Sequence, residues 1–401
     1  MTIHKEYRYD VSIELMYKNE LIKIQSMNIK SLSITYNYEK YNMPILLIHL
    51  QVDMKIKNAI IDNFITKTND FVNLSIDKYI YNDKEVDLNY NNSIKSKSNF
   101  LFKRFNYILE SSANFINKEI DYQESEDHDK VEDIAIGLID FELFKKNKLK
   151  INTVIRDSSL KSLLLFYLSR YKKILIEPFN DFKIDQFLIP PIESVTELLK
   201  YISNYYCIYT TGYILFHDFD KSYLISKSGK LTKCKGDTIN TFNIEFNNND
   251  QAIYKSSSGM YYKDDIGILT CANKSDLSIF EKSQSKELGK IGVIGSNGKY
   301  KESNIYENDN INVYKINTPN IDIVDTYKYN IILNNKIVEV SKSGLDTKEF
   351  TINKEYNIIN NDTNETMKGL LVEKNDIFLN IKEEFILTTT MRFKIIPDEL
   401  L

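Results

Sequence analysis

Two consecutive prolines, Pro190 and Pro191, restrict the backbone near the middle of this 401-residue chain. Proline fixes its own φ angle and disfavours helical geometry at the preceding residue, so a helix can begin only after Pro191. Beyond that point apolar residues recur at three- and four-residue spacing, which predicts a helix with one buried face that ends at residues 204–206. The apolar residues of that face are Ile192, Val195, Leu198, Leu199 and Ile202.

A β-hairpin is predicted to follow this helix directly. Tyr206, Ile208 and Tyr209 begin its first strand, and Gly212 provides a bulge or a bend. Apolar residues then recur as far as position 225, and residues 218–222 form the tip. The predicted unit is a helix packed on a hairpin.

These features follow one another in a distinctive order: an apolar lead-in, a proline pair, an amphipathic helix and a tyrosine-rich hairpin. The residues that carry the pattern are Pro190, Pro191, Tyr206, Tyr209, Gly212, Tyr213, Phe216, Asp218, Phe219, Asp220, Tyr223 and Leu224. The pattern resembles baseplate hub proteins of contractile-tailed bacteriophages, above all those related to the long-tailed phages of Gram-positive bacteria. It covers residues 186–226, and a weaker likeness covers residues 1–90. We interpret the matching residues, except Phe219 and Leu224, as structural or interface residues.

The resemblance implies a particular assembly. Such hubs form trimeric rings with two related β-barrel domains in each subunit, so six similar barrels face a six-fold tail tube while the other side binds a three-fold spike. For this chain it implies a homotrimer that contacts the tail tube protein, the central spike and other baseplate proteins, with DNA only in transit through a channel. It also implies a structural virion protein of the tail baseplate, assembled in the host cytoplasm.

The N-terminal residues show the period-two alternation that is typical of strands. Residues 7–15 alternate strictly, residues 29–36 do so less strictly, and residues 44–50 have the apolar run of a buried strand. Asp53 is expected to cap a short helix after that strand. These patterns predict a β-barrel-like domain over residues 1–133.

The middle of the chain contains a second predicted helix. Either Asp157 or Ser158 is expected to cap it, and it extends through Tyr171. Its buried face is formed by Leu160, Leu163, Leu164, Tyr167 and Leu168. Together with the helix and hairpin described above, this segment predicts a small α/β insertion over residues 134–226.

From residue 227 onward, short apolar stretches alternate with Asn, Asp and Gly turns, which is typical of a barrel or a sandwich. Asn297-Gly298 is a hairpin signal, and residues 377–396 contain two strands. Further strands are predicted at 241–246, 290–294, 311–316 and 329–340. The predicted fold class is therefore β-rich α+β, with two β-barrel-like domains (1–133 and 227–401) and a smaller helix-containing α/β insertion between them.

An acidic segment closes the first predicted domain. Residues 119–133 contain eight carboxylates and one lysine. Such a run is usually a solvated loop, and the alternative is an acidic rim that faces a channel or a partner.

Composition excludes some classes of function. A net charge of −4 and a pI near 5.8 argue against a protein that coats nucleic acid. The three cysteines have no CxxC spacing, as expected for reduced thiols. No apolar run is long enough to span a bilayer, and the N-terminus lacks the apolar core of a signal peptide, so we expect synthesis in the cytosol.

No catalytic, cofactor or metal site is predicted. The four histidines are not paired at metal-ligand spacing, and His217 is expected in an exposed turn at the hairpin tip. The sequence from Asp218 lacks the glycine and the final acid of a calcium loop, and the glycines before Lys299 lack the spacing of a phosphate loop. We therefore expect a central hub protein and not an enzyme. The alternatives are another tail or baseplate structural protein or a tail-associated cell-wall hydrolase, which would require a cleft with a perturbed carboxylate or a metal.

Overall fold

The computed structural model describes most of the chain. The described residues are 5–17, 20–65, 72–82, 96–102, 131–140, 143, 147, 150–171, 174–176, 181, 183–209, 212–218, 222–227, 241–247, 260–271, 276–281, 289–316, 319–332, 336–381 and 384–396. Most of the acidic segment 119–133 and the hairpin-tip residue Asp220 lie outside them, so those two expectations are not examined by the structure.

The chain is mostly β, and one large sheet contains strands from both ends of the sequence. Its strands from the first part of the chain are β1 (Lys5–Tyr17), β2 (Glu20–Ile24), β3 (Ile29–Asn37), β4 (Ile45–Asp53), β5 (Val72–Asn82), β6 (Ser96–Phe102) and β7 (Val131–Leu138). Its strands from the last part are β13 (Thr241–Phe246), β14 (Met260–Lys263), β15 (Ile266–Cys271), β16 (Leu277–Glu281), β20 (Lys336–Ser343), β21 (Glu355–Asn360), β22 (Glu365–Ile381) and β23 (Glu384–Ile396).

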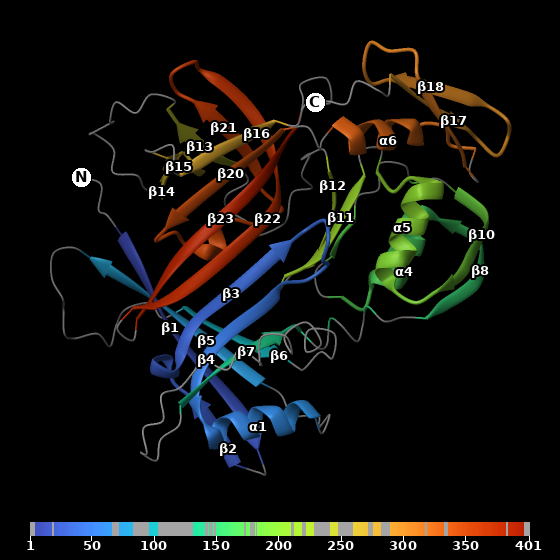
Figure 1. The fold of residues 1–401 in the computed structure, drawn as a ribbon. Helices are drawn as coiled ribbons and strands as arrows, with labels where there is room; N and C mark the ends of the chain where they lie inside the picture. Colours follow the sequence, from blue (N-terminus) through green and yellow to red (C-terminus); the bar gives the residue numbers. More distant parts are fainter. Residues whose placement is uncertain are drawn as a thin grey trace.

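The long β22–β23 hairpin joins two curved halves of this sheet (Figure 1). The first part of β22 pairs with β21, whereas residues 373–379 pair with β3. Strand β23 likewise pairs with β1 at Phe385 and with β20 over residues 388–394. We call the two halves the N-terminal half-barrel (β7-β4-β3-β22-β23-β1-β5-β6) and the C-terminal half-barrel (β14-β15-β13-β21-β22-β23-β20-β16).

The predicted alternation explains why these residues form the sheet. In β3 every second residue from Leu32 to Tyr36 is buried, and in β4 the same holds from Leu46 to Val52. After β4, Asp53 accepts a hydrogen bond from the Ile56 backbone N–H at 2.8 Å, and helix α1 (Met54–Ile65) begins there, as predicted.

A helical layer packs beside the large sheet (Figure 1). It consists of the two-stranded sheet β8 (Ile151–Ser159) and β10 (Lys183–Ile192), helices α4 (Leu160–Leu168) and α5 (Val195–Tyr206), the short β9 (Ile174–Leu175), and the hairpin β11 (Tyr213–His217) and β12 (Ser222–Ser226). The predicted buried face of α4 is confirmed, but its N-cap is Ser159, whose hydroxyl accepts from the Ser162 backbone N–H at 3.1 Å.

Helix α5 begins at Val195, four residues after the second proline, because Ser194 caps it. The Ser194 hydroxyl accepts from the Glu197 backbone N–H at 3.1 Å, and the Glu197 carboxylate accepts from the Glu193 backbone N–H at 3.0 Å. The prediction that Tyr206 to Tyr209 begin a strand is wrong. The helix includes Tyr206, and Cys207 then ends it with a left-handed backbone (φ 59°).

A second small unit lies against the far end of α5. Strands β17 (Lys290–Ile294), β18 (Tyr300–Asn304) and β19 (Ile311–Lys315) form a three-stranded sheet that helix α6 (Ile323–Ile332) covers on one face. The predicted Asn297-Gly298 turn joins β17 to β18, with Gly298 at φ 77°. The predicted strand over 329–340 is wrong in its first part, which belongs to α6, and β20 begins only at Lys336.

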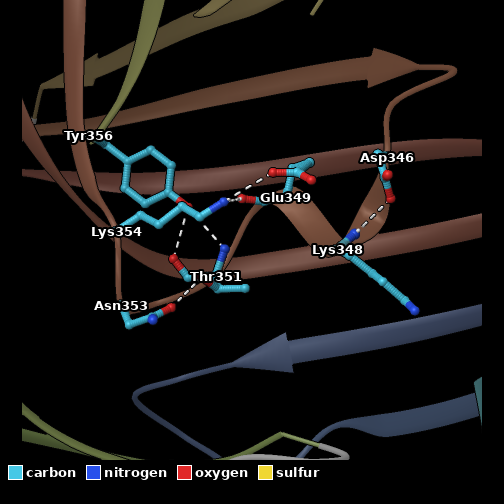
Figure 2. A network of polar contacts seen from close by, with 7 residues as sticks. All are labelled: Asp346, Lys348, Glu349, Thr351, Asn353, Lys354 and Tyr356. Atoms are coloured by element: carbon cyan, nitrogen blue, oxygen red, sulfur yellow. Dashed lines mark hydrogen bonds and ion pairs between the residues drawn. The ribbon is translucent and has the colours of Figure 1, made fainter. Parts of the chain in front are cut away.

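A local polar network orders the connection between β20 and β21 (Figure 2). The buried Tyr356 hydroxyl donates to the Thr351 carbonyl at 2.8 Å and accepts from the Thr351 N–H at 3.0 Å. The Lys354 ammonium binds the carboxylate and the carbonyl of Glu349, the last residue of the short 3-10 helix η3 (Thr347–Glu349). A second 3-10 turn, η1 (Ser26–Asn28), leads into β3.

Candidate assembly interface

The β11–β12 hairpin lies between two hydrophobic cores and contributes side chains to both. Its side chains alternate, so one face packs into the core of the large sheet and the other into the core of the helical layer. The sheet-facing residues are Ile214, Phe216, Tyr223 and Ile225, and the layer-facing residues include Leu215 and Leu224. All six are at most 5% exposed.

The sheet-facing side of the hairpin meets aromatic and charged residues. Phe216 packs edge-on against Tyr38 with ring centroids 4.4 Å apart, and it lies 6.1 Å from Tyr36. The Lys374 ammonium of β22 lies 4.1 Å from the centre of the Tyr36 ring and 3.3 Å from a carboxylate oxygen of Asp376. We call this contact region between hairpin and large sheet the hairpin seam.

The ion pair in the hairpin seam is almost completely buried. The side chains of Lys374 and Asp376 are 4% and 0% exposed, and the Thr389 hydroxyl donates to Asp376 at 2.8 Å. A buried charge is tolerated only when it is paired and hydrogen-bonded. The pair therefore constrains how β22, β23 and β3 lie beneath the hairpin.

Burial dominates the electrostatics of the two tyrosines. It raises the pKa of Tyr36 well above its ordinary value, and the nearby carboxylates of Asp218 and Asp376 raise it further. The pKa of Tyr38 is raised for the same first two reasons, burial and Asp218. Both rings are therefore neutral packing groups at physiological pH.

A second charged cluster continues the seam at the edge of the hairpin. The Lys394 ammonium binds both oxygens of Glu39 at 2.6 Å, and Lys227, just after β12, lies 3.8 Å from the same carboxylate. Burial lowers the pKa of Lys227, and the attraction of Glu39 partly opposes that shift. One carboxylate thus connects the hairpin to β23 and to the β3–β4 connection.

His217 lies within this contact, so the prediction of an exposed turn is wrong. Its side chain is 0% exposed, its ring stacks on Tyr171 with centroids 4.0 Å apart, and its Nδ1 is 2.8 Å from the Ser222 hydroxyl. Its backbone N–H donates to the Asn42 carbonyl at 2.7 Å. The strand continues as far as His217, which places its ring between sheet and helical layer and not at the tip.

The remaining predicted interface residues range from buried to exposed. Tyr209, Phe216 and Tyr223 are buried, Gly212 adopts φ 84° before β11, and Tyr206 and Tyr213 are partly buried in the helical layer. Of the two prolines in β10, Pro190 is partly buried and Pro191 is exposed, while Asp218 is partly buried at the end of β11. The hairpin residues therefore pack within the chain and stabilise its fold. Their contact with a partner stays a prediction.

Exposed apolar residues at strand edges were not identified from the sequence. Ile279 and Phe280 on β16 are 41% and 53% exposed, and Tyr261 and Tyr262 on β14 are 39% and 47% exposed. The sequence does not distinguish these exposed residues from buried ones. Neither the spacing of apolar residues nor their composition shows which strand lies at the edge of a sheet.

Neither a metal-binding cluster nor a membrane-spanning helix occurs in the described part of the chain. Among the residues that the structure describes, no three His, Cys, Asp or Glu side chains gather closely enough to hold a metal ion. Within the same residues, no helix combines the length and the apolar character that crossing a bilayer requires.

Comparison with known proteins identifies the fold. No protein-family model matches the chain, and no curated protein matches it significantly. Solved structures do match over nearly the whole length. A tail protein from Neisseria meningitidis MC58 is similar with a TM-score of 0.52 at 8% identity, covering 98% of this chain and 97% of that one. The 43 kDa tail protein of prophage MuSo2 from Shewanella oneidensis has a TM-score of 0.50 at 10% identity, covering 95% of this chain and 98% of that one.

The fold is thus similar to that of these two tail proteins, and the similarity extends over both half-barrels and the region between them. The resemblance to phage tail proteins that residues 186–226 predicted is confirmed at the level of the fold, as is the β-rich α+β fold class. The predicted boundaries at 133 and 226 stay predictions. Within the described residues, strands of the first and last predicted domains pair directly in one sheet.

Proposed function

We propose that this chain is the central hub of a contractile tail baseplate, a structural protein that joins the tail tube to the central spike. In this proposal three copies form a ring, other baseplate proteins bind its outer side, and DNA passes through without being bound. The protein resides in the tail baseplate of the virion after assembly in the host cytoplasm, and it catalyses no reaction.

The observation that carries the proposal is the pair of half-barrels held together by β22 and β23. A single chain with two similar β units can present six such units from a three-fold ring, which resolves the mismatch between a six-fold tube and a three-fold spike. The full-length similarity to tail proteins supports the same conclusion, because it includes both half-barrels.

The exposed apolar residues at β14 and β16 support assembly as well. A free strand edge with apolar side chains is a liability in a monomer and is usually covered or paired. In an obligate ring these edges would be buried in large apolar interfaces. The described parts of β14 and β16 pair only with β15 and β20, respectively.

Light scattering combined with negative-stain images of the same sample tests this proposal. We expect the mass of a trimer and rings with a central hole, with the purified tail tube protein and spike bound on opposite sides. A stable monomer that binds neither protein, or one that degrades peptidoglycan, would contradict it. Tube binding without ring formation would favour a different structural role in the tail.

A further inference from the structure

The three-stranded sheet β18-β17-β19 has one open face. Helix α6 covers the face that contains Ile291 and Val293, and Tyr314 of β19 stacks on Tyr327 of α6 on that covered side, with ring centroids 4.6 Å apart. The strand register places three rows of residues on the opposite face. These rows are Asn304-Lys290-Ile311, Glu302-Gly292-Val313 and Tyr300-Ile294-Lys315.

Tyr300 lies across the centre of this open face. A Cβ atom added to Gly292 would be 2.6 Å from the Tyr300 Oη and 2.7 Å from its Cε2, so the ring occupies the space that a side chain would fill. The Tyr300 hydroxyl donates to a Glu302 carboxylate oxygen at 2.9 Å, which fixes the ring in this position. Tyr300 is nonetheless 47% exposed, so the ring is available to a ligand from the solvent side.

Polar and apolar groups surround this ring. Ile311 and Val313 are 40% and 48% exposed along one edge of the face. At one end, Lys290 and Asn304 lead into an open hollow of about 730 Å³, which falls within the usual size of small-molecule sites. Its other polar lining residues include Tyr306, Asn308, Asp309 and Lys328.

We propose that this face and the adjoining hollow form a binding site for a neutral oligosaccharide. Sugar rings present apolar C–H faces, which stack on an aromatic ring, and hydroxyl groups, which both donate and accept hydrogen bonds. Tyr300 supplies the aromatic surface. Glu302 and Asn304 supply acceptors, and Lys290 supplies a donor.

Charge favours a sugar over a nucleic acid, the other common ligand of an aromatic surface. Single-stranded nucleic acid requires a positively charged groove along its phosphates. Here the carboxylates of Glu302, Glu307 and Asp309 lie among the lysines, which disfavours a polyanion. The same carboxylates are good acceptors for sugar hydroxyls.

The length of the site sets the length of the ligand. Strand β17 has five residues, so the open face extends about 15 Å along it. This length and the hollow accommodate a chain of a few sugar units. The proposal does not depend on the hub function, because this unit is separate from the strand edges of the two half-barrels.

Titration of the full-length protein with chitotetraose, cellotetraose and maltotetraose, followed by calorimetry, tests the proposal. We expect at least one of them to bind, and Tyr300→Ala to weaken that binding about tenfold or more through loss of stacking. Tyr300→Phe retains the ring and should weaken it only a few-fold. Tyr314→Ala is the matched control, because that tyrosine lies on the covered face, and it should leave binding unchanged.

Gly292→Ala provides an independent test. The added methyl group must displace the Tyr300 ring, so binding should fall as much as in Tyr300→Ala, while the melting temperature reports whether the small sheet remains folded. Failure of all three tetrasaccharides to bind at up to roughly 10 mM, or binding that survives both Tyr300→Ala and Gly292→Ala, would overturn the proposal. Loss of a tail-protein contact in Tyr300→Ala, without any sugar binding, would overturn it in favour of a protein-docking surface.

Discussion

The two faces of the β11–β12 hairpin are built from different chemistry. Leu215 and Leu224 face a core of aliphatic side chains and tyrosine rings, where Leu198 and Leu199 of α5 are at most 1% exposed. The opposite face meets the hairpin seam, where tyrosine rings pack beside the buried ion pair between Lys374 and Asp376.

This difference suggests separate roles for the two faces: one stabilises the helical layer, and the other positions that layer on the large sheet. Apolar packing tolerates volume-conserving rearrangement, so the helical layer is stabilised without a unique alignment being required. A buried ion pair contributes little net stability, but its loss leaves an uncompensated buried charge. Lys374 and Asp376 both lie on β22, and they are linked to the hairpin through the Tyr36 ring, which lies 4.1 Å from the Lys374 ammonium and 6.1 Å from the Phe216 ring. We infer that the apolar face holds the hairpin in the helical layer, and that the seam fixes where this layer docks on the large sheet.

The largest effect is expected from a charge in the apolar face. Leu198→Asp places an unpaired carboxylate at a position that is 0% exposed, which should cost about 5 kcal/mol and unfold the helical layer. Circular dichroism during thermal unfolding measures this loss. Leu198→Met, which conserves volume, is the control and should cost less than about 1.5 kcal/mol. An unchanged melting temperature in Leu198→Asp would show that the assigned packing is wrong.

The next largest effect is expected in the hairpin seam. Lys374→Met leaves the Asp376 carboxylate buried without its cation and should cost about 3 kcal/mol in the free energy of unfolding. The double variant Lys374→Met/Asp376→Asn removes both charges and should recover a large part of that loss. Urea titration of both variants measures the two free energies. A double variant that is less stable than the single one would contradict the proposed role of the pair.

The smallest effect is expected at the start of α5, outside both faces. Ser194→Ala removes the cap on the Glu197 N–H and should cost about 1 kcal/mol, whereas Ser194→Gly should cost only a few tenths. Differential scanning calorimetry resolves such a change against the wild type. Equal losses in the two variants would mean that the hydroxyl does not cap the helix.

Local signals explain which parts of the fold were predictable. The proline pair, the 3-4 spacing in α5 and the Gly212 bend act within a few residues, and they located the helix and the hairpin correctly. The same reasoning failed for Tyr206, since the capping of a helix end by Cys207 in a left-handed conformation leaves no apolar pattern. Residues 96–99 are polar, yet they belong to β6, because pairing with β5 outweighs their composition.

Contacts between distant residues explain what was not predictable. Strand β3 pairs with β22 more than 300 residues away, and no local pattern specifies that neighbour. The burial of His217 depends on Tyr171 from another element. Lys374 and Asp376 lie in the polar run of residues 373–376, whose composition predicts solvent exposure, yet both side chains are buried. The sequence therefore predicted the helix and the hairpin of the candidate interface. The buried charges and the exposed edge strands could be identified only from the tertiary structure.

Hydrogen exchange of the β11–β12 hairpin tests most directly whether its two faces act separately. In Lys374→Met we predict faster exchange at hairpin amides 213–217 and 222–226, with residues 199–203 of α5 still protected as in the wild type. Equal acceleration in the hairpin and in α5 would contradict the account, because it would show that both faces belong to one cooperative core.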